Sequence, residues 1–145
     1  MQVYIFIISY MIIKTFNKER DIKIIKLHKK EVGEDLNILS DKYNINVFYD
    51  KNEIVGYIIY IITENTVNIS WIYAPNYGKL AMIQMEKLFK KKAITAILLN
   101  VSIDPNENKN TVMKRLNFYI GLQYKVYDIK FRKKYGPLLS MKKNI

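Results

Sequence analysis

The sequence predicts one α/β domain over residues 1–145, with a central mixed, mostly antiparallel, β-sheet flanked by helices. Three observations support this fold class. The chain has 145 residues, which is a usual length for one domain. Apolar residues make up 50% of it, enough to fill one core. Runs rich in Ile, Val, Tyr and Phe alternate with stretches of helical periodicity, and no repeat or linker divides them.

Residues 1–13 predict a buried first strand. The run is almost entirely apolar and rich in β-branched and aromatic residues. A membrane-spanning helix needs about 20 apolar residues, so this run is too short to span. A signal peptide carries its basic residues before the apolar run, whereas Lys14 follows it. We therefore expect a strand, a cytoplasmic location and no membrane partner.

Residues 18–36 predict one helix followed by the start of a second. Asn17 is expected to cap the first helix, and Gly33 to break the chain between the two. The single histidine, His28, lies among lysines, and we expect it to be partly exposed on the helix surface. Four apolar residues fall at helical spacing and are expected to face the core: Ile25, Val32, Leu36 and Leu39.

The next three strands are expected to form an antiparallel meander. Two β-rich runs flank residues 50–53, which predict a hairpin turn, and residues 63–65 predict a second turn. A third strand begins at residue 66 and is stopped by Pro75.

A helix is then expected from about Lys79, ending in the lysines at 90–92, which suit a helix C-terminus. Its expected inner face holds Ala81, Met85 and Leu88. Residues 94–103 are nearly all apolar and predict a buried strand. This strand should run parallel to the third meander strand, because a helix connects the two.

The chain closes with a helix over residues 108–121 and two strands over residues 124–135 and 137–145. Gly121 is expected to terminate the helix. Its expected inner face holds Val112, Leu116 and Tyr119. The predicted order is β–α–α–β–β–β–α–β–α–β–β.

Composition excludes several kinds of site. The chain has no cysteine, which excludes a disulfide framework, a thiolate metal site and a cysteine nucleophile. It has one histidine, which excludes a multi-histidine metal centre, so we expect no metal. Abundant Ile, Lys, Asn and Tyr, all with codons rich in A and T, indicate an A/T-rich genome.

The net charge of +11 lies entirely in the second half. Residues 1–78 hold nine basic and nine acidic side chains, whereas residues 79–145 hold fifteen basic and four acidic ones. This asymmetry indicates an anionic ligand or partner for the second half. A solvated lysine-rich surface explains the same charge equally well. Lys130, Arg132 and their neighbours in 130–134 suit phosphate, nucleic acid or an acidic protein, but no nucleic-acid motif accompanies them.

Four segments, in this order and spacing, resemble the GCN5-related N-acetyltransferase (GNAT) family. Residues 48–60 resemble its paired strands, in which a charged turn precedes a glycine, here Gly56. Residues 71–89 resemble its acetyl-CoA segment, in which a strand ends before a proline and a phosphate-binding loop opens a helix. Residues 108–122 resemble its N-x-x-A…Y…G-F segment, and residues 138–143 its last strand. The resemblance covers residues 45–145 well and the first 44 loosely.

The resemblance implies a GNAT-like acetyltransferase domain that binds acetyl-CoA or coenzyme A. A helix N-terminus would bind the pyrophosphate through its N–H groups and dipole. Backbone groups of Ile72 and Tyr73 would hold the pantetheine, and an N–H near Tyr73 would stabilise the oxyanion. The further cofactor-binding residues that the resemblance implies are Tyr77, Gly78, Lys79, Leu80, Ala81 and Asn110.

Three features depart from the family pattern, and one of them is Met113, which stands where the family usually has alanine. The phosphate loop has one glycine, Gly78, and Lys79 stands in for the usual arginine as a point charge. The family's tyrosine, the general acid to the departing thiolate, falls on Asn117. Tyr119 is our candidate for that role. It lies about 200° around the helix from Asn117, so we expect it to substitute only if the helix is locally distorted.

The general base is not identified by sequence. Glu53 and Glu64 lie in turns, and the third meander strand carries no acid. Water relayed through Ser70 or Tyr73 is one candidate route. A general base is not essential, because positioning an amine against the thioester supplies much of the rate enhancement of acyl transfer. Trp71 suits core packing better than an acceptor pocket.

Two functions follow from these observations. The first is an acetyl-CoA-dependent N-acetyltransferase that moves an acetyl group to a primary amine by direct attack on the thioester. The second is a catalytically inactive GNAT-like binding module whose basic C-terminal half holds an acidic protein or nucleic acid. The acceptor and the oligomeric state, a dimer among the options, are left open.

Overall fold

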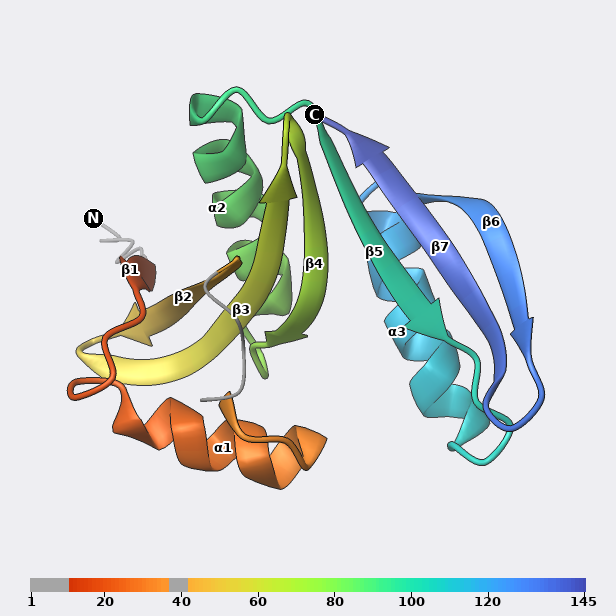
Figure 1. The fold of residues 1–145 in the computed structure, drawn as a ribbon, viewed down its shortest axis with the longest axis horizontal. Helices are drawn as coiled ribbons and strands as arrows, with labels where there is room; N and C mark the ends of the chain where they lie inside the picture. The colour runs from red at the N-terminus through yellow and green to blue at the C-terminus, as the bar shows by residue number, and fades with distance from the viewer. Residues whose placement is uncertain (1–10, 37–41) are drawn as a thin grey trace, which may run out of the picture.

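The computed structural model describes residues 11–36 and 42–145. Within them the elements follow one another as drawn in Figure 1. They are β1 (Met11–Thr15), α1 (Ile22–Val32), β2 (Tyr43–Asp50), β3 (Glu53–Thr63), β4 (Thr66–Tyr73), α2 (Gly78–Lys91), β5 (Ala96–Ser102), α3 (Lys109–Gly121), β6 (Lys125–Arg132) and β7 (Gly136–Asn144).

The described strands form one seven-stranded sheet in the order β1-β2-β3-β4-β5-β7-β6. Strands β1 to β4 pair antiparallel, as do β5 with β7 and β7 with β6. The pair β4 and β5 is parallel, as the connecting helix predicts. The predicted mixed, mostly antiparallel sheet is therefore confirmed.

Two tight turns set the register of the meander. Lys51 and Asn52 both have positive φ, 52° and 66°, which is the geometry of a two-residue hairpin turn that matches the strand twist. The second turn, between Thr63 and Thr66, has Glu64 at φ 56°. Both predicted turns are confirmed.

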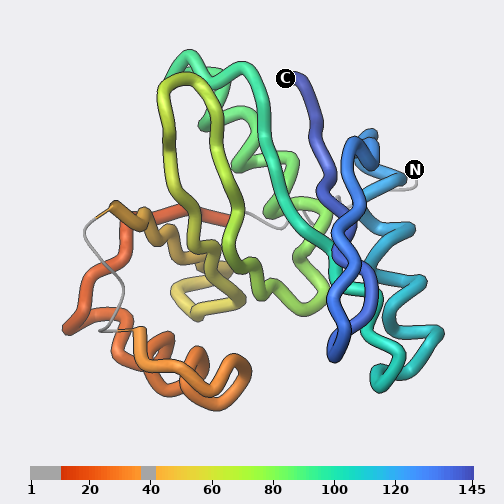
Figure 2. Tube along the Cα trace, turned by 45° about the vertical axis from the view of Figure 1, so that its right-hand side comes forward, coloured from red at the N-terminus to blue at the C-terminus, as the bar shows by residue number. Residues whose placement is uncertain are grey.

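Helices cover the two faces of the sheet unequally. Along β3, Ile58 and Tyr60 pack in the cluster formed with α2 and α3, while Tyr57 and Ile59 pack in the cluster formed with α1. Successive strand residues point to opposite faces, so α1 lies on one face, and α2 and α3 lie on the other. Figures 1 and 2 show α1 apart from the other two helices.

The N-terminal region corrects two expectations. Asn17 caps a turn rather than α1: its Oδ1 accepts hydrogen bonds from the N–H groups of Glu19 and Arg20, and α1 begins later, after Asp21. The inner face of α1 is formed by Ile24 and His28, whereas Val32 is 36% exposed. His28 itself is buried, so its predicted exposure is wrong. Its hydrogen bond to Tyr57 explains why a polar ring is accepted there.

Helix ends follow the predicted glycines in part. Gly33 has φ 82° and is the left-handed residue that closes α1. Helix α3 does end at Gly121, but the left-handed residue that follows it is Gln123, at φ 76°. The strand predicted for residues 1–10 and the part of the second helix that includes Leu39 lie outside the described residues. Among the helices that the structure describes, none has the length and apolar character needed to cross a membrane.

Candidate active site in the cleft between β4 and β5

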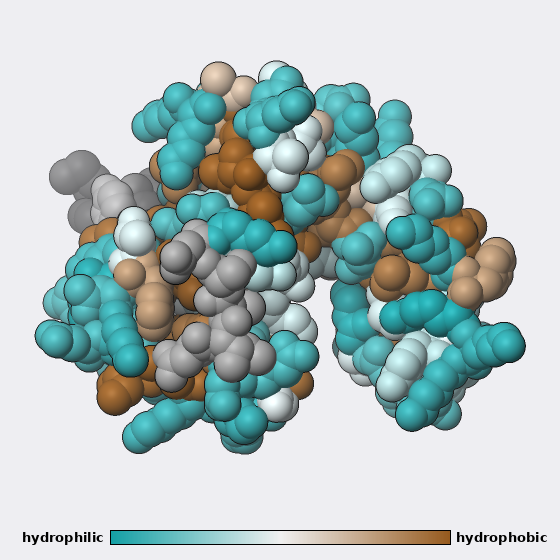
Figure 3. All heavy atoms as spheres, viewed as in Figure 1, coloured by the Kyte–Doolittle hydropathy of each residue, from teal (hydrophilic) through white to brown (hydrophobic). Residues whose placement is uncertain are grey.

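Strands β4 and β5 meet at one end and then separate. Their pairing covers only residues 66–68 against residues 96–98, although β4 continues to Tyr73 and β5 to Ser102. The two strands diverge in Figures 1 and 2, and the space-filling view in Figure 3 shows a hollow between the two halves of the molecule. Separation leaves the facing backbone edges of both strands without strand partners.

A β-bulge in β4 accompanies this separation. Tyr60 pairs with Ile69 and Ile59 pairs with Trp71, so Ser70 is an extra residue on β4. A bulge bends its strand and increases the local twist. The bend lies directly after residue 68, where the pairing with β5 ends.

The cleft between the separated strands has a volume of about 450 Å³. It brings together Ile72 of β4, which the family resemblance implies, and Tyr119 of α3, the candidate proton donor. The other residues that line it are Ile69, Ser70, Trp71, Leu99, Asn100, Ser102, Glu107 and Arg115.

Tyr119 reaches the cleft from a regular helix. Helix α3 is continuous from Lys109 to Gly121, and Asn117 is exposed on its outer side. Tyr119 therefore lines the cleft without a local distortion of the helix, and its substitution for Asn117 as the general acid stays a prediction. Tyr119 is 9% exposed and packs edge-on against Phe118 and Tyr124. Burial raises the pKa of Tyr119, with the nearby Arg115 opposing, so its hydroxyl carries a proton at neutral pH.

An ion pair that the sequence analysis missed lies beside Tyr119. Arg115 Nη2 is 2.8 Å from Glu107 Oε2, and both side chains are about one-third exposed. The hydrogen bond to Glu107 raises the pKa of Arg115, so the guanidinium stays charged. Arg115 and Tyr119 are four residues apart on α3, and this spacing could have indicated that Arg115 lies beside Tyr119.

Ile72 and Tyr73 point to opposite faces of the sheet. Ile72 packs against the cluster on the α2 and α3 face, while Tyr73 packs against the α1 cluster, with its ring centroid 6.2 Å from that of Tyr57. The end of β4 lies tight against Gly56, where a Cβ would clash with the carbonyl oxygen of Tyr73. Gly56 is therefore needed for the close approach of β3 to the end of β4.

The N-terminus of α2 has no side-chain cap. Its N-cap residue, Tyr77, makes no capping hydrogen bond with its side chain, and no acidic residue lies in the first turn. The Tyr77 hydroxyl instead donates to Asp50 Oδ2 at 2.5 Å. At the start of α3, by contrast, Asn108 Oδ1 accepts hydrogen bonds from the N–H groups of Asn110 and Thr111. The first turn of α2 therefore holds no acidic side chain of its own that would interact with the helix dipole.

Helix α2 begins close to the cleft. A Cβ on Gly78 would lie 3.3 Å from Cζ of Phe118, the neighbour of Tyr119 on α3. Lys79 is exposed, while Ala81 is fully buried and its N–H donates to the carbonyl oxygen of Tyr77 at 2.8 Å. Asn110 is exposed in the first turn of α3 and is not among the residues that line the cleft.

On the other face, His28, Tyr57 and Trp71 form a buried aromatic cluster. His28 Nδ1 lies 2.8 Å from the Tyr57 hydroxyl, and the His28 and Trp71 rings meet edge to face. Burial lowers the pKa of His28 and raises the pKa of Tyr57 to about 12, so both groups are neutral at pH 7. Trp71 packs against this cluster, as expected, and also lines the cleft, so its contact with an acceptor stays a prediction.

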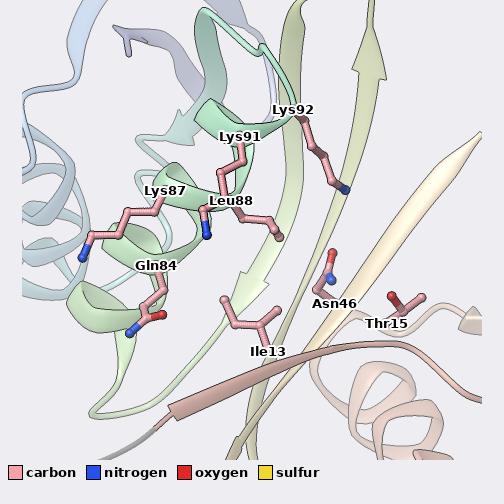
Figure 4. A pocket seen from close by; sticks show the side chains of 8 residues that line it. All are labelled: Ile13, Thr15, Asn46, Gln84, Lys87, Leu88, Lys91 and Lys92. Carbon is pink, nitrogen blue, oxygen red and sulfur yellow. The ribbon is translucent and has the colours of Figure 1, made fainter.

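A separate hollow of about 380 Å³ lies between α2 and strands β1 and β2, as Figure 4 shows. Lys87, Lys91 and Lys92 lie along it, opposite Thr15 and Asn46. It shares no lining residue with the cleft. Part of the positive charge of the second half therefore lies away from the cleft.

Comparison with known proteins extends this description. No protein-family model matches the chain, and no curated protein matches it in sequence. Solved structures do match it. The ribosomal-protein-S18-alanine N-acetyltransferase from Escherichia coli is 10% identical, with 94% of each chain covered and a TM-score of 0.73. An IAA acetyltransferase from Bacillus cereus is 11% identical, with 94% of this chain and 100% of that chain covered and a TM-score of 0.72.

The chain has the GNAT fold. A Bacillus subtilis acetyltransferase solved in complex with CoA also shares the GNAT fold, at 14% identity and a TM-score of 0.64, covering 94% of this chain and 99% of that one. The fold expected from the resemblance in residues 45–145 is thus confirmed over nearly the whole chain. At such identities the likeness concerns the fold alone, and the activity has to be inferred from the cleft.

Proposed function

We propose that this protein is an acetyl-CoA-dependent N-acetyltransferase that moves an acetyl group to a primary amine. The observation that carries the proposal is the bulged separation of β4 from β5, within a GNAT fold, over a cleft lined by Tyr119. The cleft holds the protonated hydroxyl of Tyr119, the guanidinium of Arg115 and the unpaired edges of β4 and β5. This combination suits acyl transfer to a bound nucleophile.

The residues of the chain fit coenzyme A. The uncapped N-terminus of α2 offers the backbone N–H groups of residues 78–80 to a pyrophosphate, since those of Tyr77 and Ala81 donate to backbone carbonyl oxygens, and Lys79 adds a positive charge. Gly78 has no side chain, which lets a phosphate approach the backbone. Asn110 remains a candidate contact from α3. Acetyl-CoA, when bound, supplies the activated acetyl group.

Residues of the protein would then position the thioester and protonate the departing sulfur. In an extended strand the N–H groups of neighbouring residues point to opposite sides, so of Ile72 and Tyr73 one points to β3 and the other into the cleft. That N–H would stabilise negative charge that develops on the carbonyl oxygen. Tyr119 would hold a proton for the departing sulfur. Tyr73 would contribute through its backbone, because its side chain lies on the α1 face.

The test is an assay of acetyl transfer to a panel of primary amines. Release of the free coenzyme A thiol gives the rate, and mass spectrometry identifies the acetylated product. The Tyr119→Phe variant, which keeps the ring, should lower kcat by about tenfold or more at an unchanged affinity for coenzyme A. Met113→Leu, on the exposed side of α3, is the matched control. Equal kcat values for Tyr119→Phe and the wild type would remove Tyr119 from the reaction.

A second candidate function, a binding module without catalysis, is favoured by β6. Every residue of this edge strand except Arg132 is exposed, including Val126, Tyr127, Ile129 and Phe131, the last at 84%. Exposed apolar groups between lysines suit an acidic protein or a single-stranded nucleic acid. Steeply salt-dependent binding of an oligonucleotide, without any binding of coenzyme A, would support this function over the first.

A further inference from the structure

The cleft between β4 and β5 opens on both faces of the sheet. A second hollow of about 360 Å³, here called the outer chamber, shares four of its lining residues with the cleft, namely Ile69, Ser70, Leu99 and Asn100. The residues it adds are Asn68, Leu98, Tyr127, Lys130 and Ser140. A ligand in the outer chamber would therefore reach the same stretch of β4 and β5 as one in the cleft.

The outer chamber lies on the face opposite α3. Leu99 pairs with Met141, and both pack in the cluster beneath α2 and α3. Their neighbours Asn100 and Ser140, also paired, point the other way. The Ser140 hydroxyl donates to Asn100 Oδ1 at 2.9 Å. Glu107, Arg115 and Tyr119 line only the cleft, so the two openings differ in chemistry.

The outer chamber is polar and carries one charge, which is positive. Lys130 is its only ionisable residue with a charge at neutral pH, and none of its nine lining residues is acidic. Asn68, Ser70 and Tyr127 add donor groups. The Asn100 carbonyl oxygen accepts from Ser140, which leaves the Asn100 amide hydrogens to donate.

Lys130 is the only cation among the residues that line the outer chamber. Within residues 11–36 and 42–145 it makes no hydrogen bond or ion pair, whereas Arg132 is held by the Ser102 hydroxyl and by the carbonyl oxygen of Gly136. Asp128, the nearest carboxylate on β6, pairs with Ser140 across the strands, and its Oδ1 accepts the N–H of Ile129. Asp128 does not line the outer chamber.

We propose that the acceptor is an amine that also carries a carboxylate, and that Lys130 with the donors of the outer chamber selects it. The proposal rests on the proposed function, because it names the substrate class of that reaction. The amine nitrogen bonds to the acetyl carbonyl carbon and loses one proton to water. The carbon–sulfur bond breaks, and the sulfur keeps the electron pair, takes one proton and leaves as the coenzyme A thiol. A polyamine, whose further groups are cationic, is disfavoured by Lys130.

The experiment compares two probes that differ in one charge, alanyl-glutamate amide and alanyl-glutamine amide. Their amines have nearly the same basicity, so a difference reports on the carboxylate. Binding of each to the protein saturated with coenzyme A is measured by calorimetry, and acetylation by the mass of the product. The wild type should bind the glutamate probe about tenfold more tightly, as a charged hydrogen bond allows.

Three variants distinguish a specific effect of the Lys130 side chain from an effect of the protein's net charge. Lys130→Gln should remove the preference, and Lys130→Arg should retain it. Lys133→Gln, in the exposed turn between β6 and β7, changes the net charge equally and should retain the preference for the glutamate probe.

Binding of coenzyme A with equal or undetectable binding of both probes would overturn the acceptor class and leave the proposed function standing. A preference unchanged by Lys130→Gln would overturn the role of Lys130. Failure to bind coenzyme A would overturn both proposals.

Discussion

Helices α2 and α3 begin in opposite ways. Helix α3 begins with Asn108, whose side chain accepts two backbone hydrogen bonds. Helix α2 begins with Tyr77, which provides no such cap, and its first turn has no acid. A cap contributes about 1 kcal/mol to stability, so an uncapped helix beside a cleft forgoes stability at the point where a ligand can use its N–H groups. We propose that the start of α2 serves mainly binding and the start of α3 mainly stability, with Asn110 as the one candidate contact from α3.

The strongest way to break this comparison is to fill the space at the start of α2. In Gly78→Val, the added carbons would meet Phe118 and cover the backbone that a phosphate would approach. We expect the affinity for coenzyme A to fall about 100-fold, the loss of two charge-assisted hydrogen bonds, as measured by calorimetry. Gly121→Val is the matched control, because a Cβ there meets nothing within 4 Å. Unchanged affinity in Gly78→Val would place the phosphate site elsewhere.

Reversing the charge in the same turn sharpens the comparison. In Lys79→Glu, the acid would favour the dipole of α2 but repel phosphate. We therefore expect a thermal midpoint equal to or slightly above that of the wild type, together with about tenfold weaker binding of coenzyme A. Lys109→Glu makes the matched change in the first turn of α3 and should leave the affinity unaltered. Parallel losses in both variants would indicate general electrostatics rather than a site at α2.

The cap of α3 should matter for stability alone. Asn108→Ala removes the acceptor of two backbone N–H groups and should lower the free energy of unfolding by about 1 kcal/mol. Urea titration measures this change, and coenzyme A affinity should stay constant. A loss of affinity comparable to that of Gly78→Val would mean that both helix starts take part in binding.

The remaining prediction concerns α1, which contacts the sheet through His28. Burial lowers the pKa of His28 below its ordinary 6.5, although Glu34 opposes this. Below pH 6.5 the unfolded chain therefore binds more protons than the folded one, so stability falls as pH decreases, by at most about 1.4 kcal/mol per pH unit. In His28→Gln the decline between pH 7 and pH 5 should be flatter, measured by thermal unfolding. Identical slopes in the two proteins would show that His28 does not titrate on unfolding.

Local signals predicted most of the fold. The turns at 50–53 and 63–65 lie between β-rich runs, and each contains an asparagine, which favours turns, so both hairpins could be located from the local sequence. The parallel pairing of β4 with β5 followed from the helix between them. The bulge at Ser70 carries no such local signal, because it depends on how β4 crosses β3 and leaves β5.

The site was harder to predict, since its residues meet across the fold. Glu107 and Arg115 lie in a loop and a helix that look like ordinary surface until the cleft places them beside Tyr119. His28 was misassigned because its partner, Tyr57, is 29 residues away. The inner face of α1 was also misassigned, because the alternation of Ile and Lys allows two apolar faces, and docking on the sheet chooses between them.

The most direct measurement is calorimetric titration of the purified protein with acetyl-CoA, with coenzyme A as the comparison. An uncapped α2 beside the cleft predicts saturable binding at one site with a micromolar Kd. A folded protein that produces no binding heat at high micromolar acetyl-CoA would contradict the acetyltransferase function and leave the basic edge at β6 as the remaining site of action.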